Sequence, residues 1–325
     1  MDDILSLAAT NLISPIILSF VLGVVAALAR SDLTIPEAVA KGMSIYLLFA
    51  IGFKGGAGVA AHGVDTTLVA TILAGLVLSF ALPFIAFYLL RVLTPLGVIE
   101  RAAVAAHYGS ISIVTFVAAT SVVGGRGLNP EGYMVAVAAV MEAPAILSAL
   151  WLVSRSNGNA NVDAGLYREI LFNGSIVLLV GSFLIGVATG EDGLEKIAPF
   201  IVAPFQGVLC LFLLDMGLVA GRGLRDSRSD LGAGAIVFGM LMPLIGSMIG
   251  LLAALAVGLS PGGAALLMTL AASASYIAVP AAMRVALPEA RPSIYLTLSL
   301  GVTFPFNLTI GIPLYTALAG TFVGG

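Results

Sequence analysis

The chain has 325 residues, of which 60% are hydrophobic and only 10% are charged. Soluble domains contain about 25% charged residues, so this chain cannot cover a globular surface with polar groups. The net charge is −3 and no basic run occurs, which argues against a nucleic-acid partner. Apolar runs of about twenty residues recur along the whole sequence, and each can cross a bilayer as a helix. We therefore predict an all-α, polytopic membrane protein.

Charged residues and Pro/Gly-rich breaks divide the apolar sequence into ten predicted spans. The spans are 11–29, 36–56, 67–90, 102–123 and 131–153 in the first half, and 170–189, 198–219, 232–258, 263–286 and 292–318 in the second. The polar stretch SRSNGNANVDAGLYR (154–168) separates the halves. Ten spans place both termini on the same side of the membrane.

The Lys and Arg residues indicate which side this is, because cytoplasmic loops carry the basic excess. With both termini outside, the cytoplasmic span ends hold Arg30, Lys41, Arg91, Arg101, Arg155, Arg168, Arg222, Arg225, Arg228, Arg284 and Arg291. The outer ends then hold only Lys54, Arg126 and Lys196 of the 14 basic residues. We therefore predict both termini on the outer face of a plasma (inner) membrane.

Three sequence blocks of the first half recur in order in the second half. The blocks 42–56, 109–119 and 132–145 align with 207–221, 272–282 and 293–307. The aligned pairs are Gly52 with Gly217, Gly56 with Gly221, Ser110 with Ser273, Ser112 with Ser275, and Tyr133 with Tyr295. The shared order and nearly constant offset predict an internal repeat.

The predicted repeats are residues 1–155 and 169–325, joined by a short cytoplasmic linker at 156–168. Each repeat has five spans, so the second enters the membrane from the opposite face. The fold expected is therefore two inverted five-helix repeats. Secondary transporters commonly have this architecture, with substrate bound near the midplane between discontinuous helices.

The segment GSISIVT in the fourth span places small and hydroxyl-bearing residues at mid-membrane depth. It lies 8 to 14 residues beyond Arg101, or about 12–21 Å along a helix axis. Glycine permits unusual backbone conformations and serine is a favoured N-cap. We predict that this helix breaks after about His107 and restarts near Ser110–Ser112. The new N-terminus would direct free amides and a partial positive charge into the protein centre.

The ninth span repeats this construction from the other membrane face, with Ser273 and Ser275 as caps and Pro280 reinforcing the break. Two crossing half-helix N-termini would then hold one small anion. The predicted anion site comprises Gly109, Ser110, Ile111, Ser112, Ala272, Ser273, Ala274 and Ser275. The alternative interpretation is that small residues and serines only let the helices pack closely.

Glu142 lies in the fifth span, where a membrane-embedded acid is costly and marks a functional-site candidate. It can complete a sodium site, shuttle a proton, or accept hydrogen bonds from a neighbouring broken helix. Thr115, Thr303 and Asn307 are the neutral oxygen donors best placed to bind a cation with it. Prolines beside Glu142 and Asn307 free backbone carbonyls that can also bind a cation.

Two charged residues near the span ends are candidates for coupling or gating. Asp215 lies in the seventh span, where it can pair with a basic residue or control a gate. Lys54 lies near the outer end of the second span. It can attract an incoming anion, or anchor the helix by reaching water. The sequence contains no Cys/His cluster, P-loop or nucleophile elbow, so neither an enzyme nor an ATP-driven pump is suggested, and no cofactor is predicted.

Four blocks together resemble the cyanobacterial sodium-dependent bicarbonate transporter family: FAIGFKGG (49–56), AAHYGSISIVTFVAA (105–119), VMEAPA (140–145) and LAASASYIAVPAAMRVALPEA (270–290). The resemblance implies a gate part from spans one, two, six and seven and a core part from the other six. It also implies Na⁺-coupled HCO₃⁻ uptake, trimeric assembly, and inhibition by a cytoplasmic PII-like signalling protein. The short loop 154–168 departs from the longer cytoplasmic insertion of the family.

Three rival functions remain open at this stage. A transporter of the same fold can carry another small anion, such as a carboxylate or sulfate. A cation/proton antiporter would instead depend on Glu142 and Asp215 and tolerate loss of the serines. A membrane scaffold or receptor would show no flux, and alanine would replace its serine pairs without effect.

Overall fold

A computed structural model describes residues 13–63, 65–142, 144–157, 174–226, 232–276 and 278–323. Most of the predicted linker 156–168 lies outside these ranges. All regular structure in the described residues is helical. Eight helical segments are long and apolar enough to span a membrane, and Pro15–Leu28 and Pro261–Ala272 are shorter apolar helices. The prediction of an all-α, multi-pass membrane protein is therefore confirmed.

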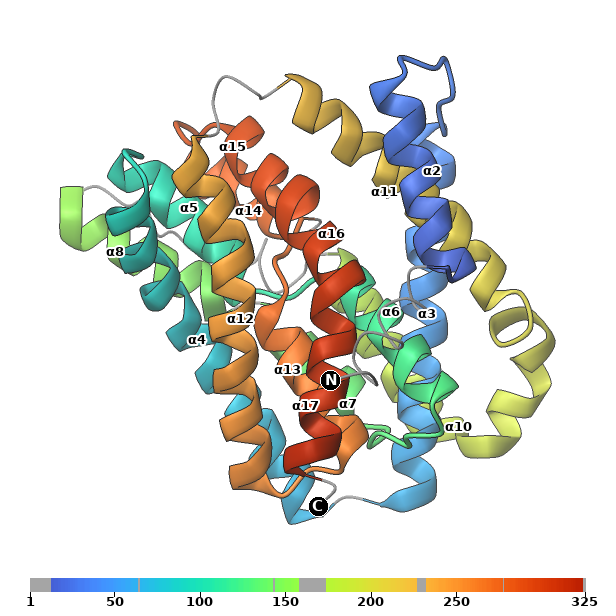
Figure 1. Cartoon of the computed structure of the whole chain (residues 1–325). Helices are drawn as coiled ribbons and strands as arrows, with labels where there is room; N and C mark the ends of the chain where they lie inside the picture. Colours follow the sequence, from blue (N-terminus) through green and yellow to red (C-terminus); the bar gives the residue numbers. More distant parts are fainter. Residues whose placement is uncertain are drawn as a thin grey trace.

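The helices follow the predicted spans with shifted ends (Figure 1). The first half contains α2 (Pro15–Leu28), α3 (Glu37–His62), α4 (Thr66–Leu93), α5 (Val98–Gly109), α6 (Ile113–Gly125), α7 (Met134–Val140) and α8 (Pro144–Asn157). The second contains α10 (Gly174–Ile201), α11 (Phe205–Asp226), α12 (Ala233–Val257), α13 (Pro261–Ala272), α14 (Ala278–Ala286), α15 (Pro292–Leu296), η1 (Thr297–Thr303), α16 (Phe304–Phe306), η2 (Asn307–Gly311) and α17 (Ile312–Phe322).

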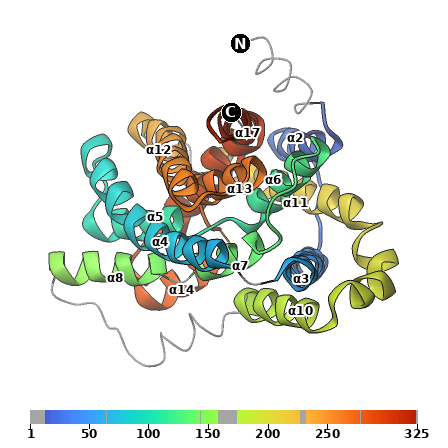
Figure 2. The same ribbon diagram turned by 90° about the horizontal axis from the view of Figure 1, so that it is seen from below.

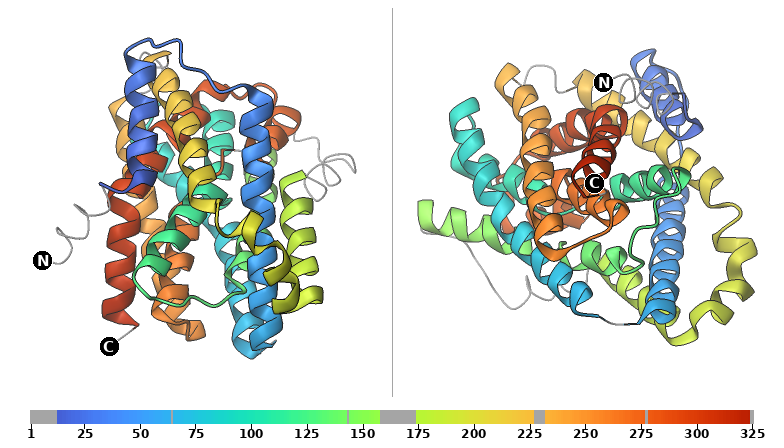
Figure 3. Two further views of the ribbon diagram at one scale, coloured as in Figure 1. Left: turned by 90° about the vertical axis from the view of Figure 1, so that its right-hand side faces the viewer. Right: turned by 60° about the horizontal axis from the view of Figure 1, so that its bottom comes forward.

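Four helices form a group along one side of the molecule. There α2 packs along α11, and α3 packs along α10. Figure 2 and the right-hand view of Figure 3 show α2, α3, α10 and α11 around one flank, with the other helices beside them. The second group is built around α4, α5, α12 and α13, which pack on one another. The two groups correspond in sequence to the spans that the family resemblance assigns to a gate and a core.

Glycines bring α3 and α10 into close backbone contact. A Cβ on Gly56 would lie 2.0 Å from the carbonyl oxygen of Phe183, and one on Gly186 would lie 2.2 Å from that of Phe53. Only a residue without a side chain fits at such distances. In a membrane, where lipid is as apolar as leucine, this close packing is a principal force between helices.

The α2–α11 pair is built in the same way. A Cβ on Gly23 would lie 2.1 Å from the carbonyl oxygen of Leu214, and one on Gly217 would lie 2.1 Å from that of Phe20. Gly221 faces Ala27 one turn further along. Gly52 and Gly56 of α3 meet α10, just as Gly217 and Gly221 of α11 meet α2. Small residues four positions apart are the spacing that lets helix backbones approach.

We predict that Gly56→Ala destabilises the protein, because the added methyl group meets backbone atoms that cannot rotate away. The overpacking should cost about 1–3 kcal/mol, measured as a lower thermal midpoint of the purified protein in detergent. Gly42→Ala on the same helix is the matched control, since nothing lies within 4 Å of its Cβ position. An equal shift in both variants would contradict the packing argument.

Helical structure continues past the predicted end of the sixth span at residue 189. The helix α10 continues to Ile201, but Gly190 has φ 60° and ψ −150°, which interrupts the helical path. Glycine tolerates this backbone conformation because it has no Cβ. The segment beyond Gly190 begins with the acidic residues Glu191 and Asp192. The apolar part of the span therefore ends where predicted, and a charged helical segment follows it.

Two interruptions were not predicted. The fifth span is divided between α7 and α8 around Glu142. The tenth span contains two π-helical segments, η1 and η2. Such π-bulges are rare and occur frequently at functional sites.

Candidate functional site where two helix breaks cross

The fourth span breaks at the predicted segment but two residues later than expected. The helix α5 continues to Gly109, and the amide of Ser110 still donates to the carbonyl of Ala106 at 3.1 Å. Ser110 and Ser112 are extended, and α6 begins at Ile113. The prediction that the first half ends at about His107 was therefore wrong, because the regular hydrogen bonds of α5 persist past it.

Gly109 has a different role from the one predicted. It lies in helical conformation at the last position of α5. A Cβ there would lie 2.3 Å from Cγ of Pro83 in α4 and 2.9 Å from the Cβ of Ala145 in α8. Glycine is needed here for close approach of neighbouring helices, and no unusual backbone conformation is involved.

The ninth span breaks at the matching place. The helix α13 ends at Ala272, Ser273–Tyr276 are non-helical, and α14 begins at Ala278. Ser273 is extended, with φ −86° and ψ 163°, close to the values of −84° and 167° at Ser110. Both breaks thus leave their first helix through a serine of the same backbone conformation.

The two serines of each break have different roles, which corrects the prediction that Ser273 and Ser275 both cap a half-helix. The hydroxyl of Ser112 caps α6 by accepting the Thr115 amide at 3.2 Å. The hydroxyl of Ser275 accepts the Val279 amide of α14 at 3.5 Å. Ser110 and Ser273 instead follow the C-terminal ends of α5 and α13. Their amides donate back to Ala106 and Leu270, so these two residues end a helix and do not start one.

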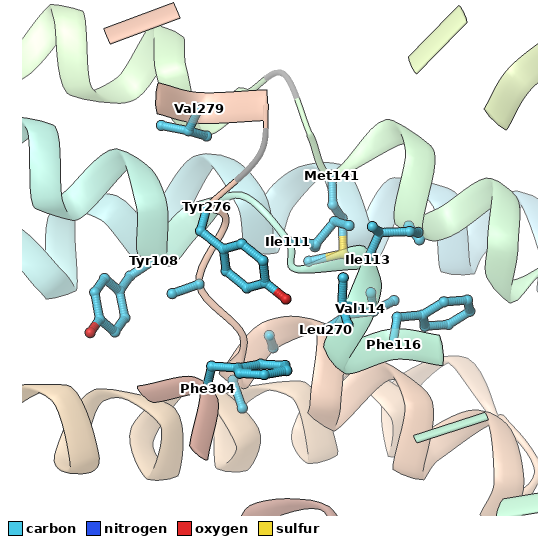
Figure 4. Close-up of a cluster of buried hydrophobic side chains, with 14 of the residues drawn as sticks. Tyr108, Ile111, Ile113, Val114, Phe116, Met141, Leu270, Tyr276, Val279 and Phe304 are labelled. Carbon is cyan, nitrogen blue, oxygen red and sulfur yellow. The ribbon is translucent and has the colours of Figure 1, made fainter. Parts of the chain in front are cut away.

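The two breaks are in direct contact. The Ser112 amide donates to the Ser273 hydroxyl at 2.9 Å, and the Ser275 amide donates to the His107 carbonyl at 2.7 Å. Figure 4 shows the segment of Tyr276, from the second half of the chain, beside that of Ile111, from the first half. The structure therefore brings the residues predicted as an anion site together from opposite halves of the chain.

This crossing is buried, and no Lys or Arg side chain that the structure describes lies in it. The four serine side chains are 1–3% exposed. Among the Lys and Arg residues whose side chains the structure describes, none is buried, and Arg155 and Arg284 lie outside that set. Positive potential at the crossing therefore comes from the N-terminal ends of α6 and α14, each equivalent to about half an elementary charge.

Glu142 lies next to the first break. The hydroxyl of Ser110 donates to its carboxylate at 3.3 Å, and the side chain is 6% exposed. The preceding carbonyl, of Met141, accepts a hydrogen bond from Ser79 at 2.6 Å. Within the described residues no Lys or Arg forms an ion pair with Glu142. A carboxylate in this position requires either a proton or a bound cation to compensate its charge.

The three neutral oxygen residues predicted for the sodium site are buried but belong to separate hydrogen-bonded groups. Thr115 donates to the Ser112 hydroxyl at 2.9 Å. Thr303 donates to the Gly239 carbonyl at 2.6 Å and bonds the Tyr108 hydroxyl. Asn307 donates to the Ala272 carbonyl at 2.9 Å, at the end of α13. Each of the three therefore bonds a residue of the fourth or ninth span. None of them is hydrogen-bonded to Glu142.

The two predicted coupling residues lie away from the crossing. The Lys54 ammonium lies 3.9 Å from the centroid of the Phe205 ring and lines a cavity of about 500 Å³. Phe116 of α6 and Leu266 of α13 line the same cavity. Asp215 is buried in α11, where the charge of Arg222 acts on it. Lys54 therefore shares a cavity with residues of α6 and α13, the helices that border the two breaks.

Sequence analysis missed Tyr276, which lies in the second break directly after Ser275. Its side chain points into the crossing in Figure 4. Its position in the sequence could have indicated it. Tyr276 follows the second Ser-x-Ser, and the aligned residue of the first half is the apolar Ile113. A polar residue in one repeat at the position of an apolar residue in the other is a candidate for a functional role.

The chain was compared with known proteins and protein families. It matches the family described as the Na⁺-dependent bicarbonate transporter superfamily over residues 15–320. No curated protein matches the chain. The family match covers both breaks, Glu142 and nearly all of the described helices. The chain therefore belongs to the Na⁺-dependent bicarbonate transporter superfamily, a family of membrane transporters and not of enzymes.

Proposed function

We propose that this protein is a sodium-coupled symporter that imports bicarbonate by alternating access. Family membership supports Na⁺-dependent bicarbonate transport as the activity. The observation that carries the mechanism is the direct contact of two buried helix breaks from opposite halves of the chain. Discontinuous helices that meet at mid-membrane are the usual substrate seat of secondary transporters.

The anion is held where the N-termini of α6 and α14 meet, at Gly109–Ser112 and Ala272–Ser275. Helix N-termini bind anions through free first-turn amides and the helix dipole. With no buried Lys or Arg among the side chains that the structure describes, the site suits a small monovalent anion better than a dianion. This favours bicarbonate over sulfate within the same fold.

The sodium ion is held near Glu142, with Thr115, Thr303 and Asn307 supplying neutral oxygens in the sodium-loaded state. The support is the buried carboxylate without a basic partner in the described residues. The Ser110 hydroxyl joins this carboxylate to the anion seat at 3.3 Å. A shared side chain between the two seats gives a direct route for coupling ion and anion binding.

The two halves form an inverted repeat in this proposal, with gate helices α2, α3, α10 and α11 and a core of the remaining helices. The aligned glycines support it: Gly56 packs on α10, and its counterpart Gly221 packs on α2. Two cavities lie between the proposed parts, one lined by Lys54 and one of about 360 Å³ lined by Arg222. Movement of the core against the gate would open the breaks to these cavities in turn.

The remaining expectations follow from the charge distribution and the family resemblance. Both termini lie on the outer face of the plasma membrane, with Arg222, Arg225 and Arg291 at the cytoplasmic ends. Of these, Arg225 donates to the Ala27 carbonyl and Arg291 lies 3.5 Å from Glu100. A homotrimer and a PII-like cytoplasmic regulator are further expected partners, while the Asp215 and Lys54 side chains act in gating.

Uptake of labelled bicarbonate into proteoliposomes tests this function. We expect an inward Na⁺ gradient to drive accumulation, and replacement of Na⁺ by K⁺ to abolish it. Formate, acetate and sulfate are tested as competitors, since a same-fold transporter of another anion would be inhibited by its own substrate at lower concentration. Uptake that ignores Na⁺, or flux driven by a proton gradient alone, would contradict the proposal.

A further inference from the structure

Tyr276 occupies an unusual position in the second break. Its side chain is 9% exposed, and its ring packs edge-on against Phe304 with centroids 5.4 Å apart. Figure 4 shows its hydroxyl directed toward the start of α6, where Ile113 and Val114 lie. The ring is therefore anchored on the side of η1 and α16 while its polar end enters the crossing.

The Tyr276 hydroxyl has no hydrogen-bond partner among the described residues. The Ser112 hydroxyl lies beside it but does not meet hydrogen-bond geometry. Two other buried tyrosines nearby are satisfied, since Tyr108 bonds Thr303 and Tyr315 donates to Asn307. A buried hydroxyl without a hydrogen-bond partner costs free energy, and a bound ligand is one way to supply the missing partner.

The surroundings of this hydroxyl select an anion. The first-turn amides of α6, at Ile113 and Val114, have no acceptor within their own helix. They present N–H groups at the positive end of the helix, close to where the hydroxyl points. An oxyanion can accept hydrogen bonds from the amides, from the phenol and from Ser112 together, whereas a cation can accept none of them.

We infer that Tyr276 is a substrate-binding residue whose phenol donates a hydrogen bond to an oxygen of a small monovalent oxyanion seated on the first turn of α6. The inference rests on the proposed function for the identity of that anion as bicarbonate. The inference makes the site asymmetric. Ile113, which is aligned with Tyr276, has no hydroxyl, so a phenol donor reaches only the N-terminal end of α6. The anion is therefore held closer to α6 than to α14.

Tyr276→Phe tests the inference, because it removes the hydroxyl and keeps the ring that packs on Phe304. A hydrogen bond to a charged ligand is lost, so the KM for bicarbonate in proteoliposome uptake should rise about 10–100-fold. The Na⁺ concentration for half-maximal uptake, measured at saturating bicarbonate, should stay within about twofold. Tyr133→Phe is the matched control, since Tyr133 is the other buried tyrosine in the described residues whose hydroxyl has no partner.

An unchanged bicarbonate KM, or an equal change in Tyr133→Phe, would overturn the inference. A change confined to Na⁺ dependence would also overturn it, because the phenol oxygen would then bind the cation.

Thermal unfolding in detergent with added bicarbonate, nitrate or formate gives a second measurement that needs no transport. An anion that stabilises wild type but not Tyr276→Phe supports the inference even if Na⁺-driven bicarbonate uptake fails. Equal stabilisation of both proteins, or of neither, counts against it.

Discussion

Replacement of both Ser112 and Ser275 by alanine should lower the apparent affinity for bicarbonate about 100-fold or more. Each hydroxyl caps a half-helix, through the Thr115 amide for α6 and the Val279 amide for α14. Loss of a serine N-cap costs about 1 kcal/mol, and loss of a hydrogen bond to a charged ligand about 1.5–3 kcal/mol. Since 1.4 kcal/mol corresponds to a tenfold change, the two substitutions together should nearly abolish uptake at low bicarbonate.

The control must remove buried hydroxyls without touching the crossing. Ser299→Ala with Thr269→Val serves this purpose, because each hydroxyl donates only to a carbonyl of its own helical segment, Tyr295 and Ala265. We expect near-normal uptake from this control in the same proteoliposomes. If Ser112→Ala/Ser275→Ala transports as well as the control, the serines are packing residues and the anion seat lies elsewhere.

Glu142→Gln should remove the dependence of bicarbonate uptake on Na⁺. Glutamine keeps an oxygen for the Ser110 hydroxyl, which now donates to the carboxylate at 3.3 Å, but it removes the negative charge that attracts the cation. The Na⁺ concentration for half-maximal uptake should rise about tenfold or more, since a charge-assisted contact is worth at least about 1.5 kcal/mol. Uptake kinetics over a series of Na⁺ concentrations provide the measurement.

Two other carboxylates sharpen this test. Glu100→Gln changes a partly buried acid in the first turn of α5 that pairs with Arg291. The Na⁺ dependence of uptake by this variant should stay normal. Asp215→Asn separates the symporter from the cation/proton antiporter, which would need both acids. Flux that is coupled to protons and lost in both Glu142→Gln and Asp215→Asn would favour the antiporter.

Membrane class was readable from the sequence because lipid imposes a simple rule. Backbone groups in hydrocarbon must be satisfied within a helix, so long apolar runs can only be spans. The helices α4 and α12 accordingly match the predicted spans 67–90 and 232–258 within three residues at either end. Their ends are set locally, for example by the N-cap of Asp65 on α4.

The breaks in the fourth and ninth spans were also predicted, because Ser-x-Ser recurs at matched positions of the two halves. The roles of the individual serines were not, since a sequence motif does not show whether a serine ends one helix or starts the next. The hydrogen bonds decide this: the Ser110 and Ser273 amides donate back into α5 and α13, whereas the Ser112 and Ser275 hydroxyls accept amides of α6 and α14. The division of the fifth span at Glu142 was not predicted, although the sequence places Glu142 and Pro144 there.

The sequence by itself determined that this is a multi-pass helical membrane protein, where its spans lie, and which family it belongs to. Hydrophobic length and short motifs carry that information, and both are local. Only the tertiary structure decided that Ser112 meets Ser273, that Ser275 meets His107, and that Tyr276 points into their crossing. These pairs are far apart in the chain, and their contact depends on how glycine-lined helices pack, which no local pattern specifies.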